Sequence, residues 1–479
     1  MGTTNSQSTN NVTWFEFIHA IHIPSLALVS LAVWLHAADA LIVATMLPSI
    51  VGDLGGASLV GWLVALYEMG SIVAGATSAL LVMRYGLRRP MKAAALIFGL
   101  GCFFSAISQS MPFMLIGRLL QGIGGGGLVA MGFVTVSTVF ERRYIARALA
   151  IISAFWGLSA FMGPLIGGLF IEFANWRLGF GFFGLKAIGL AVWIGFHAPH
   201  SRQADQQKDP KIRLPAARLA LLSASILSVA IAGIDVGPIT SPVLIGIGLI
   251  AFVLFLRRDA LAGDHSRLLP YAPLNPRTPA GATLSMILAL SIATIPITAF
   301  GPLLISAIHN PSALTIGYIV ACSSIGWTIT AIAVSSAPER LDALLITLGI
   351  LLVVLSIPGF IVTIPRGPLW LIAACATLEG GGFGIAWTFI LRRTTALSPP
   401  EETQRIAGAL PTIQRFGYAI GAAYIGLIAN TAGFLEMSTP DHARSVAQIV
   451  FLACVPPALF SIPGLWGLVR PQPEFSLLK

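Results

Sequence analysis

Residues 117–127 read Gly-Arg-Leu-Leu-Gln-Gly-Ile-Gly-Gly-Gly-Gly, and residues 157–168 read Gly-Leu-Ser-Ala-Phe-Met-Gly-Pro-Leu-Ile-Gly-Gly. Both stretches lie inside long apolar segments, and their one charge is Arg118. An arginine at membrane depth costs several kcal/mol and usually faces a cavity or a partner. Dense glycines let neighbouring helix backbones approach closely, and such runs can also be packing surfaces only. The two stretches therefore predict closely packed membrane helices. Packing does not require a charged residue at position 118, so Arg118 is expected to have another role.

The composition is that of a polytopic membrane protein. Of the 479 residues, 56% are hydrophobic and 10% are charged, a balance unknown in soluble domains of this length. The net charge of +9 comes mainly from short loops, so it indicates topology and not nucleic-acid binding. The sequence has no phosphate-binding glycine-lysine-serine loop, and we expect neither an enzyme nor a cofactor. The cysteines lie in apolar segments without zinc-ligand spacing, so we expect free thiols and no metal site: Cys102, Cys322, Cys375 and Cys454.

Apolar segments long enough to cross a membrane follow one another along nearly the whole chain. A spanning helix needs roughly 20 apolar residues, and on that rule we expect about fourteen spans. Loops rich in Lys and Arg alternate with loops that hold few, and the positive-inside rule then places both termini in the cytoplasm. The expected spans are 25–51, 58–83, 91–109, 112–140, 148–173, 178–197, 216–236, 240–256, 279–307, 313–337, 343–364, 368–391, 404–430 and 443–469.

Part of the sequence recurs. Gln-Gly-Ile-Gly-Gly-Gly at 121–126 matches Glu-Gly-Gly-Gly-Phe-Gly at 379–384, and the glycines of 157–163 are echoed at 417–421. Repeated halves with a site between them, near the bilayer midplane, are typical of secondary transporters. We therefore predict an all-α membrane protein of two pseudo-symmetric six-helix bundles with two helices between them. The expected division is a cytoplasmic segment with an interfacial helix at 1–24, bundles at 25–197 and 279–470, a linker with the inserted helix pair at 198–278, and a cytoplasmic tail at 471–479.

These motifs resemble the major facilitator superfamily, specifically its drug:proton antiporter branch with fourteen spans. Residues 163–168 resemble the span-five antiporter motif, and 118–122 resemble the span-four motif, whose arginine is linked in the family to proton coupling. The resemblance covers nearly the whole chain. It implies the major facilitator fold, alternating access, and proton-coupled export of amphipathic drugs across the cell inner (plasma) membrane. It also implies motif or gating roles for Gly163, Pro164, Gly167, Gly168, Arg84, Gly86 and Arg88.

The loop after the second span departs from the family pattern. The family carries an Asp before Arg-x-Gly, whereas this chain has Met83 before Arg84. The charge relay that the family's Asp supplies therefore has no matching carboxylate at this position. The Asn-x-Pro usual in the sixth span is also missing, and Lys186 lies nearby.

Ionisable residues remain inside the expected spans. Four of them, Asp39, Glu68, Glu379 and Arg415, lie about 10–12 residues from a span end, roughly 15–18 Å deep. Each of these must be paired with another group or face water. A dry site disfavours an ionised carboxylate and a nearby arginine favours it, so a carboxylate under both influences can bind and release a proton. We predict proton coupling by Asp39, Glu68 and Arg118, and substrate binding by Glu379, Arg415, Lys186, Trp387, Tyr418 and Gln121.

Each of these assignments has a structural alternative. The carboxylates and Arg415 can form ion pairs only, and Lys186 can extend its long side chain toward the membrane surface. The aromatic residues in the spans can be packing. His36, one turn from Asp39, is expected to be a hydrogen-bonded packing histidine and not a proton relay.

Three functional hypotheses follow. The first is a proton-driven exporter of amphipathic toxic compounds. The second is a carrier of a metabolite, organic acid or siderophore, which Lys186 and Arg415 motivate because cationic drugs do not favour cavity cations. The third is a sensor or assembly subunit that transports nothing, to which Met83 in place of Asp lends support. The expected partners are a small-molecule substrate, protons and membrane lipid, with a periplasmic adaptor as a further candidate. Nucleic acid is not expected as a partner. The protein is expected to be a monomer.

Overall fold

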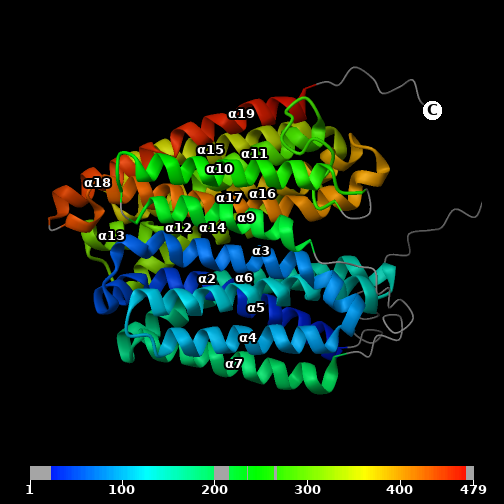
Figure 1. Cartoon of the computed structure of the whole chain (residues 1–479), viewed down its shortest axis with the longest axis horizontal. Coiled ribbons are helices and arrows are strands. Elements are labelled where there is room, and N and C mark those ends of the chain that lie inside the picture. The colour runs from blue at the N-terminus through cyan, green and yellow to red at the C-terminus, as the bar shows by residue number, and fades with distance from the viewer. Residues whose placement is uncertain (1–22, 199–214, 235, 264–266, 438, 471–479) are drawn as a thin grey trace, which may run out of the picture.

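The computed structural model describes residues 23–198, 215–234, 236–263, 267–437 and 439–470. Every regular element of these residues is a helix, and the long helices lie side by side along one direction (Figure 1). The predicted all-α membrane fold is therefore confirmed. The predicted interfacial helix before the first span, most of the linker and the tail lie outside the described residues.

The first group of helices follows the predicted spans closely. Asn175 begins the last of them, because its side-chain oxygen accepts a hydrogen bond from the backbone N–H of Leu178 at 2.9 Å. Gly86 ends another with φ of +74°, a backbone conformation that favours glycine. The helices are α2 (Ile23–Leu54), α3 (Val60–Tyr85), α4 (Arg88–Ala106), α5 (Met111–Val139), α6 (Arg142–Phe173) and α7 (Trp176–His197).

The second group departs from prediction at two spans. Spans 279–307 and 443–469 were expected to be continuous, and both are interrupted. Each helix that follows an interruption has a proline as its first or second residue: Pro296, Pro302 and Pro456. Proline lacks the N–H that a continuing helix needs, which explains the three breaks. The helices are α11 (Pro279–Thr294), α12 (Pro296–Ala299), α13 (Gly301–His309), α14 (Ala313–Val334), α15 (Asp342–Arg366), α16 (Leu369–Ala396), α17 (Thr403–Thr431), α18 (Pro440–Leu452) and α19 (Val455–Val469).

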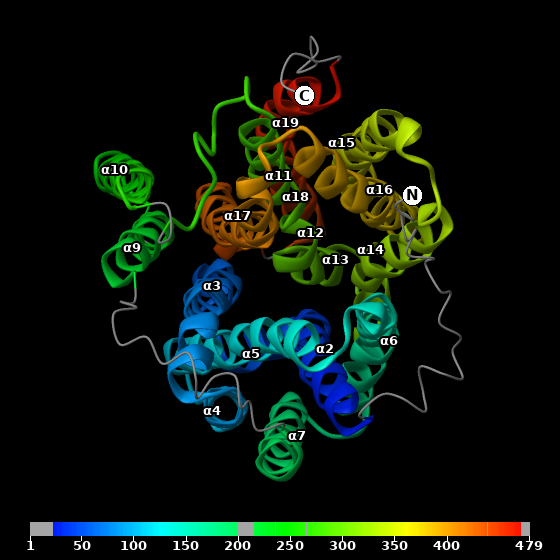
Figure 2. The same cartoon turned by 90° about the vertical axis from the view of Figure 1, so that its right-hand side faces the viewer.

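Two groups of helices face each other across the molecule. Figure 2 shows α2–α7 on one side and α11–α19 on the other, and we call these the first half and the second half. Between them, α3 packs against α17 and α14 packs against α6. The predicted domain boundaries stay a prediction, since the arrangement of helices does not by itself define independent units.

The inserted pair, α9 (Ala216–Ala232) and α10 (Thr240–Ala260), stands beside the junction of the halves (Figure 2). Trp62 of α3 donates a hydrogen bond to the Ala230 carbonyl at 3.1 Å, and Asn430 of α17 donates one to the Gly233 carbonyl at 2.6 Å. Carbonyls at the end of α9 therefore bind both halves. The Ala230 carbonyl accepts the Trp62 side chain in addition to the backbone N–H of Gly233 at 3.1 Å.

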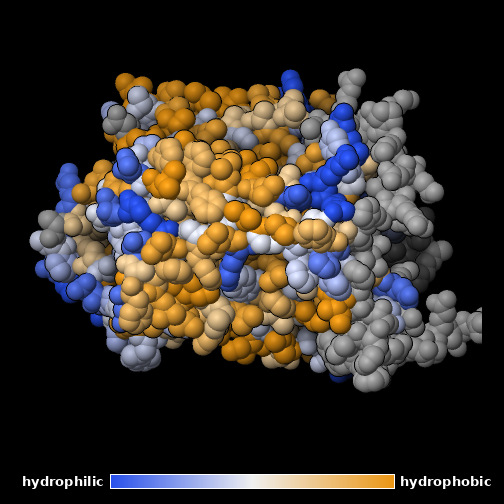
Figure 3. Space-filling model, turned by 90° about the horizontal axis from the view of Figure 1, so that it is seen from below, coloured by the Kyte–Doolittle hydropathy of each residue, from blue (hydrophilic) through white to orange (hydrophobic). Residues whose placement is uncertain are grey.

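The surface matches a membrane environment. Apolar side chains cover the middle of the face shown in Figure 3, and hydrophilic side chains gather toward its two ends. The described helices form eleven segments that are long and apolar enough to cross a membrane, and two of these, Pro279–Ala299 and Pro440–Val469, consist of consecutive α-helices. Helix α9 is shorter, at 17 residues, and α4 and α17 carry charged side chains. The count of fourteen spans is therefore not confirmed and stays a prediction.

The repeated glycines pack in equivalent ways in the two halves. A side chain on Gly122 of α5 would collide with the Tyr67 carbonyl of α3, and one on Gly380 of α16 would collide with the Ser323 carbonyl of α14. Both glycines follow the polar residue of the repeat and face the equivalent neighbouring helix. Backbones this close require glycine, so the repeat in the sequence is a repeat in helix packing.

We predict that Gly122→Ala lowers the stability of the detergent-solubilised protein, because overpacking a helix contact costs about 1–3 kcal/mol. The measurement is the midpoint of thermal unfolding. Gly189→Ala on α7 is the control, since nothing lies within 4 Å of a methyl group at that position. Equal midpoints for the two variants would contradict the proposed contact.

Candidate functional site

A buried ion pair lies inside the first half. The Arg118 guanidinium of α5 donates to Asp39 of α2, with 2.7 Å between Nη1 and Oδ2, and the side chains are 3% and 2% exposed. Arg118 also donates to Gln121 Oε1 at 2.6 Å and to the Leu63 carbonyl at 3.3 Å. Because burying an arginine is costly, it needs this many partners. The structure thus joins two of the predicted coupling residues.

Aromatic side chains connect Arg118 to His36. Its guanidinium lies over the ring of Tyr67 on α3, 4.3 Å from the ring centre, a distance at which a cation is attracted to the ring face. The Tyr67 hydroxyl lies 2.8 Å from Nδ1 of His36 on α2. The rings of Trp156 on α6 and His36 also lie edge to face, with 6.1 Å between ring centres.

The same group of residues continues into the second half. Arg415 of α17 lies 3.0 Å from His36 through Nη2 and Nε2. Its other terminal nitrogen, Nη1, donates to Glu68 of α3 at 3.0 Å. These side chains are 22% and 13% exposed, so this pair is less buried than the pair within the first half. We call the connected set the charge network: His36, Asp39, Tyr67, Glu68, Arg118 and Arg415.

The charge network balances its formal charges. Two carboxylates and two guanidiniums cancel when His36 is neutral. Any added proton leaves an unbalanced charge in a poorly solvated site, which is expensive unless a pair separates or the structure moves. The arrangement can therefore link proton binding to the contact between the halves.

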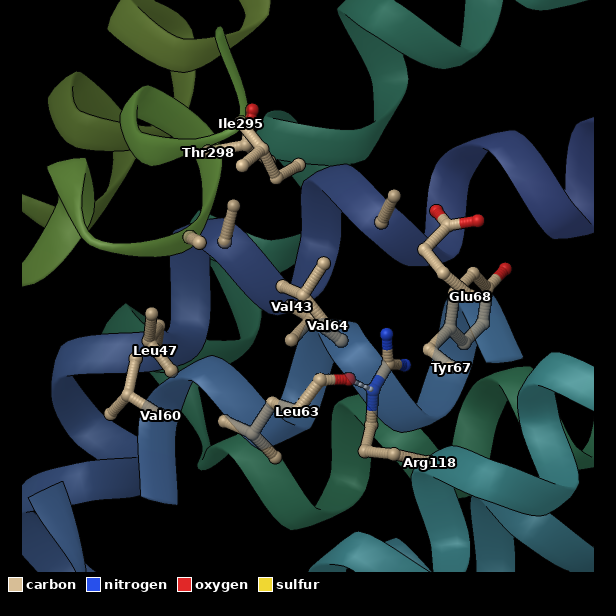
Figure 4. Close-up of a pocket in the computed structure, with 13 residues that line it drawn as sticks. Val43, Leu47, Val60, Leu63, Val64, Tyr67, Glu68, Arg118, Ile295 and Thr298 are labelled. Carbon is tan, nitrogen blue, oxygen red and sulfur yellow. Dashed lines mark hydrogen bonds between the residues drawn. The ribbon is translucent and has the colours of Figure 1, made fainter. Parts of the chain in front are cut away.

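A small cavity adjoins the charge network. It holds about 60 Å³, and Figure 4 shows Glu68, Tyr67 and Arg118 at one end of it. Apolar side chains of α2 and α3 line most of the rest, and Ile295 and Thr298 close it from the second half. Such a volume admits a few water molecules, whereas pockets for drug-sized ligands hold about 300–1,000 Å³.

Glu379 stands apart from the charge network. It is buried on α16, and its hydrogen-bond partner in the described structure is Ser323 of α14, with 3.4 Å between the oxygens. C-terminal to Ser323 and Glu379 on the same two helices is an aromatic group, in which Trp327 contacts both Phe383 and Trp387 with ring centres 5.7 and 5.5 Å apart. A carboxylate next to electron-rich ring faces is a chemistry suited to organic cations.

The other predicted substrate residues are placed differently. Gln121 is fully buried between Arg118 and the Cys102 sulfur, so it supports the ion pair from within the protein. Tyr418 of α17 accepts a hydrogen bond from Gln414 at 3.2 Å, one turn away. A substrate role for either residue is not tested by these contacts and stays a prediction.

Lys186 lies on α7, away from the charge network. Its ammonium group sits over three aromatic rings, 3.8 Å from the centre of Trp34, 4.2 Å from Phe182 and 5.7 Å from Phe183. Helix α7 is peripheral and packs against α4, α2 and α6 (Figure 2). The structure thus supplies ring faces as partners for this cation, and does not bring it together with the other predicted substrate residues.

The span-five motif lies at the contact between the halves. A methyl group on Gly163 would lie 2.8 Å from Leu41 of α2, and one on Gly168 would lie 2.8 Å from Leu314 of α14. Pro164 and Gly167 lie in the same seam, against Gly317 of α14 and Thr45 of α2 respectively. Close approach along α6 therefore holds α2 and α14 together, which suits the predicted gating role.

The predicted gating loop after α3 is short. Arg84 is exposed with its guanidinium 5.3 Å from the Tyr85 ring, Gly86 makes the turn, and Arg88 begins α4. Nothing in these contacts tests the gating role of the loop, which stays a prediction.

Sequence reasoning did not foresee the connecting parts of the site. Tyr67 is not among the predicted site residues, and His36 was expected as a packing residue. The one local signal was spacing: Gln121 follows Arg118 by one helical turn, so their contact could be expected. The contacts that join α2, α3 and α17 come from residues far apart in the chain, and no sequence pattern indicates them.

Comparison with known proteins agrees with this architecture. The model of the Major Facilitator Superfamily matches residues 29–303. A protein of Mycobacterium tuberculosis described as a probable multidrug-efflux transporter is 26% identical over 431 residues, covering 88% of this chain and 90% of the relative. A multidrug efflux pump of Staphylococcus aureus is 28% identical over 181 residues, covering 37% of this chain and 40% of the pump.

Solved structures show the same fold. A D-xylose–proton symporter matches with a TM-score of 0.66 at 13% identity, covering 94% of this chain and 98% of that chain. A bacterial homolog of the human lysosomal transporter Spinster, in an inward-facing and unoccupied conformation, matches with a TM-score of 0.62 at 14% identity and the same coverage. With a family model that matches more than half of its residues, this chain belongs to the major facilitator superfamily and is a multi-pass membrane transporter.

Proposed function

We propose that the protein exports amphipathic compounds across the cell inner membrane in exchange for protons, by alternating access. One observation carries the proposal: the charge network joins a buried ion pair of the first half to an arginine of the second half. A transporter that exchanges protons for cargo must let proton binding change the relation between its halves. The similarity to a probable multidrug-efflux transporter, which covers most of both chains, supports export as the direction of transport and amphipathic drugs as the class of cargo.

The second half supports an organic cation as cargo. Glu379 has a hydroxyl partner and no cation within ion-pair distance in the described structure, and aromatic rings continue along the same helices. A lipophilic cation would gain both a charge partner and ring faces there. We therefore assign Glu379, with Trp387, to the cargo, and Asp39 or Glu68, with Arg118, to the proton.

The carrier of an anionic metabolite receives less support. It was motivated by Arg415 and Lys186, and Arg415 is engaged by Glu68 and His36 while Lys186 sits against aromatic rings. We further propose that the protein acts as a monomer with both termini in the cytoplasm, and that its partners are its substrate, protons and membrane lipid. A periplasmic adaptor stays a prediction.

Purified protein in liposomes tests the proposed function directly. With an imposed pH gradient, we expect proton flux that depends on added substrate, measured with an entrapped pH-sensitive dye over a panel of cationic and neutral drugs. Empty liposomes are the control. Flux equal to that control across the whole panel would overturn the proposal.

Different carboxylates should bind the proton and the cargo. We predict that Glu379→Gln weakens transport of a cationic substrate and changes that of a neutral one much less, because only the cation uses the charge. Asp39→Asn and Glu68→Gln should reduce uphill accumulation of both substrates, because both depend on the proton. The measurement is accumulation of one cationic and one neutral substrate by all three variants. The reverse pattern would contradict the assignment.

The buried ion pair should also show itself in stability. We predict that Arg118→Met abolishes uphill transport and costs stability, because an unpartnered buried carboxylate costs about 3–5 kcal/mol. The double variant Arg118→Met/Asp39→Asn should regain much of that stability and none of the transport. Thermal unfolding and transport of the single and double variants decide this. Uphill transport by Arg118→Met would remove Arg118 from the mechanism.

A further inference from the structure

The partners of His36 determine where its ring carries a proton. A guanidinium donates hydrogen bonds and accepts none, so Arg415 Nη2 must donate to His36 Nε2 across their 3.0 Å contact. Nε2 is therefore unprotonated, and the neutral ring carries its proton on Nδ1. That proton is donated to the Tyr67 hydroxyl at 2.8 Å, and the hydroxyl hydrogen can turn to the His36 carbonyl at 3.4 Å. Both ring nitrogens are used, and the ring is neutral in this conformation.

A second proton on the ring would break this arrangement. It would bind Nε2, remove the acceptor used by Arg415, and put two cations 3.0 Å apart. The carboxylates nearby are already engaged: Asp39 by Arg118, and Glu68 by Arg415. Neither can neutralise a charged His36 without giving up its arginine, so the repulsion would act on the contact with Arg415.

No further charge faces the ring from the other helices packed on α2, as far as the described residues show. Helix α6 presents Trp156, α5 presents Arg118, which is itself a cation, and α3 presents Tyr67 and Glu68. On α7, Lys186 lies against Trp34, and on α14, Tyr318 lies against Phe161 with 5.7 Å between ring centres. On α13, which also packs against α2, His309 contacts the Ile364 carbonyl through Nε2 at 2.8 Å.

We propose that His36 is a proton-binding site of the transport cycle, and that its protonation releases Arg415 and so loosens the contact between the halves. Linkage gives the direction: protons favour a conformation in which Arg415 has left His36, and the return to the present conformation expels the proton. The inference rests on the proposed exchange of protons for cargo, to which it adds the step that moves the halves.

The test separates proton binding from hydrogen bonding. In His36→Gln, the amide oxygen can accept from Arg415 and the amide nitrogen can donate to Tyr67, while the side chain cannot titrate. His197→Gln is the matched control, since His197 is exposed at the end of α7 and stacks on Trp193. Spin labels on Tyr85→Cys of α3 and Ala407→Cys of α17, both exposed, report the distance between the halves after the native cysteines are replaced.

The expected result is a distance distribution that shifts between about pH 8 and about pH 5.5 in the labelled parent and in His197→Gln. In His36→Gln the distribution should stay at its high-pH form, and uphill transport should fall by about tenfold or more. If His36→Gln does not fold, Glu68→Gln serves instead. His36 and Arg415 both remain in that variant, so the pH-dependent shift should persist, and its loss would assign the proton to Glu68 and overturn the role of His36.

Two failures are distinguishable. A pH-dependent shift in His36→Gln equal to that of the parent overturns the role of His36, even if the parent pumps protons. A parent with no substrate-dependent proton flux overturns the proposed function, and with it the place of His36 in a transport cycle.

Discussion

The structure depends on how one buried guanidinium is satisfied. Arg118 is almost fully enclosed, so the solvation it loses must be replaced by protein groups. It receives a carboxylate from α2, a carbonyl and a ring face from α3, and an amide from its own helix. Those demands fix α2, α3 and α5 relative to one another. Glycines such as Gly122 allow the helices to come close enough to meet them.

The two ion pairs of the charge network differ in a way that suits alternating access. The pair of Arg118 and Asp39 lies within one half and is nearly inaccessible, whereas the pair of Arg415 and Glu68 joins the halves and is partly exposed. Separating a partly hydrated pair costs less, because water replaces each partner. Motion between the halves should therefore break the second pair and preserve the first. His36 contacts the arginine of the second pair and, through Tyr67, the surroundings of the first.

Small residues and prolines set where the halves meet and where helices bend. The seam of α6 against α2 and α14 uses the glycines of the span-five motif, and Gly61 of α3 lies against the Ala422 carbonyl of α17. Helices in such close contact are densely packed, so each half is expected to move as a rigid body when the halves separate. The breaks at Pro296 and Pro456 divide two spans of the second half into shorter helices. The inserted pair binds both halves through backbone carbonyls of α9.

The sequence by itself determined the membrane class, the helical fold and the repeat, because these depend on composition and on local spacing. Its motifs also resemble those of the family. It also indicated Arg118 and Asp39 as buried charges, since charge inside an apolar span is visible in the chain. Only the tertiary structure decided which charges meet. Arg415 reaches Glu68 and His36 across more than three hundred residues, and Lys186 meets aromatic rings instead of the other charges. Depth along a helix can be counted from the sequence, whereas the direction a side chain faces depends on how the helices pack.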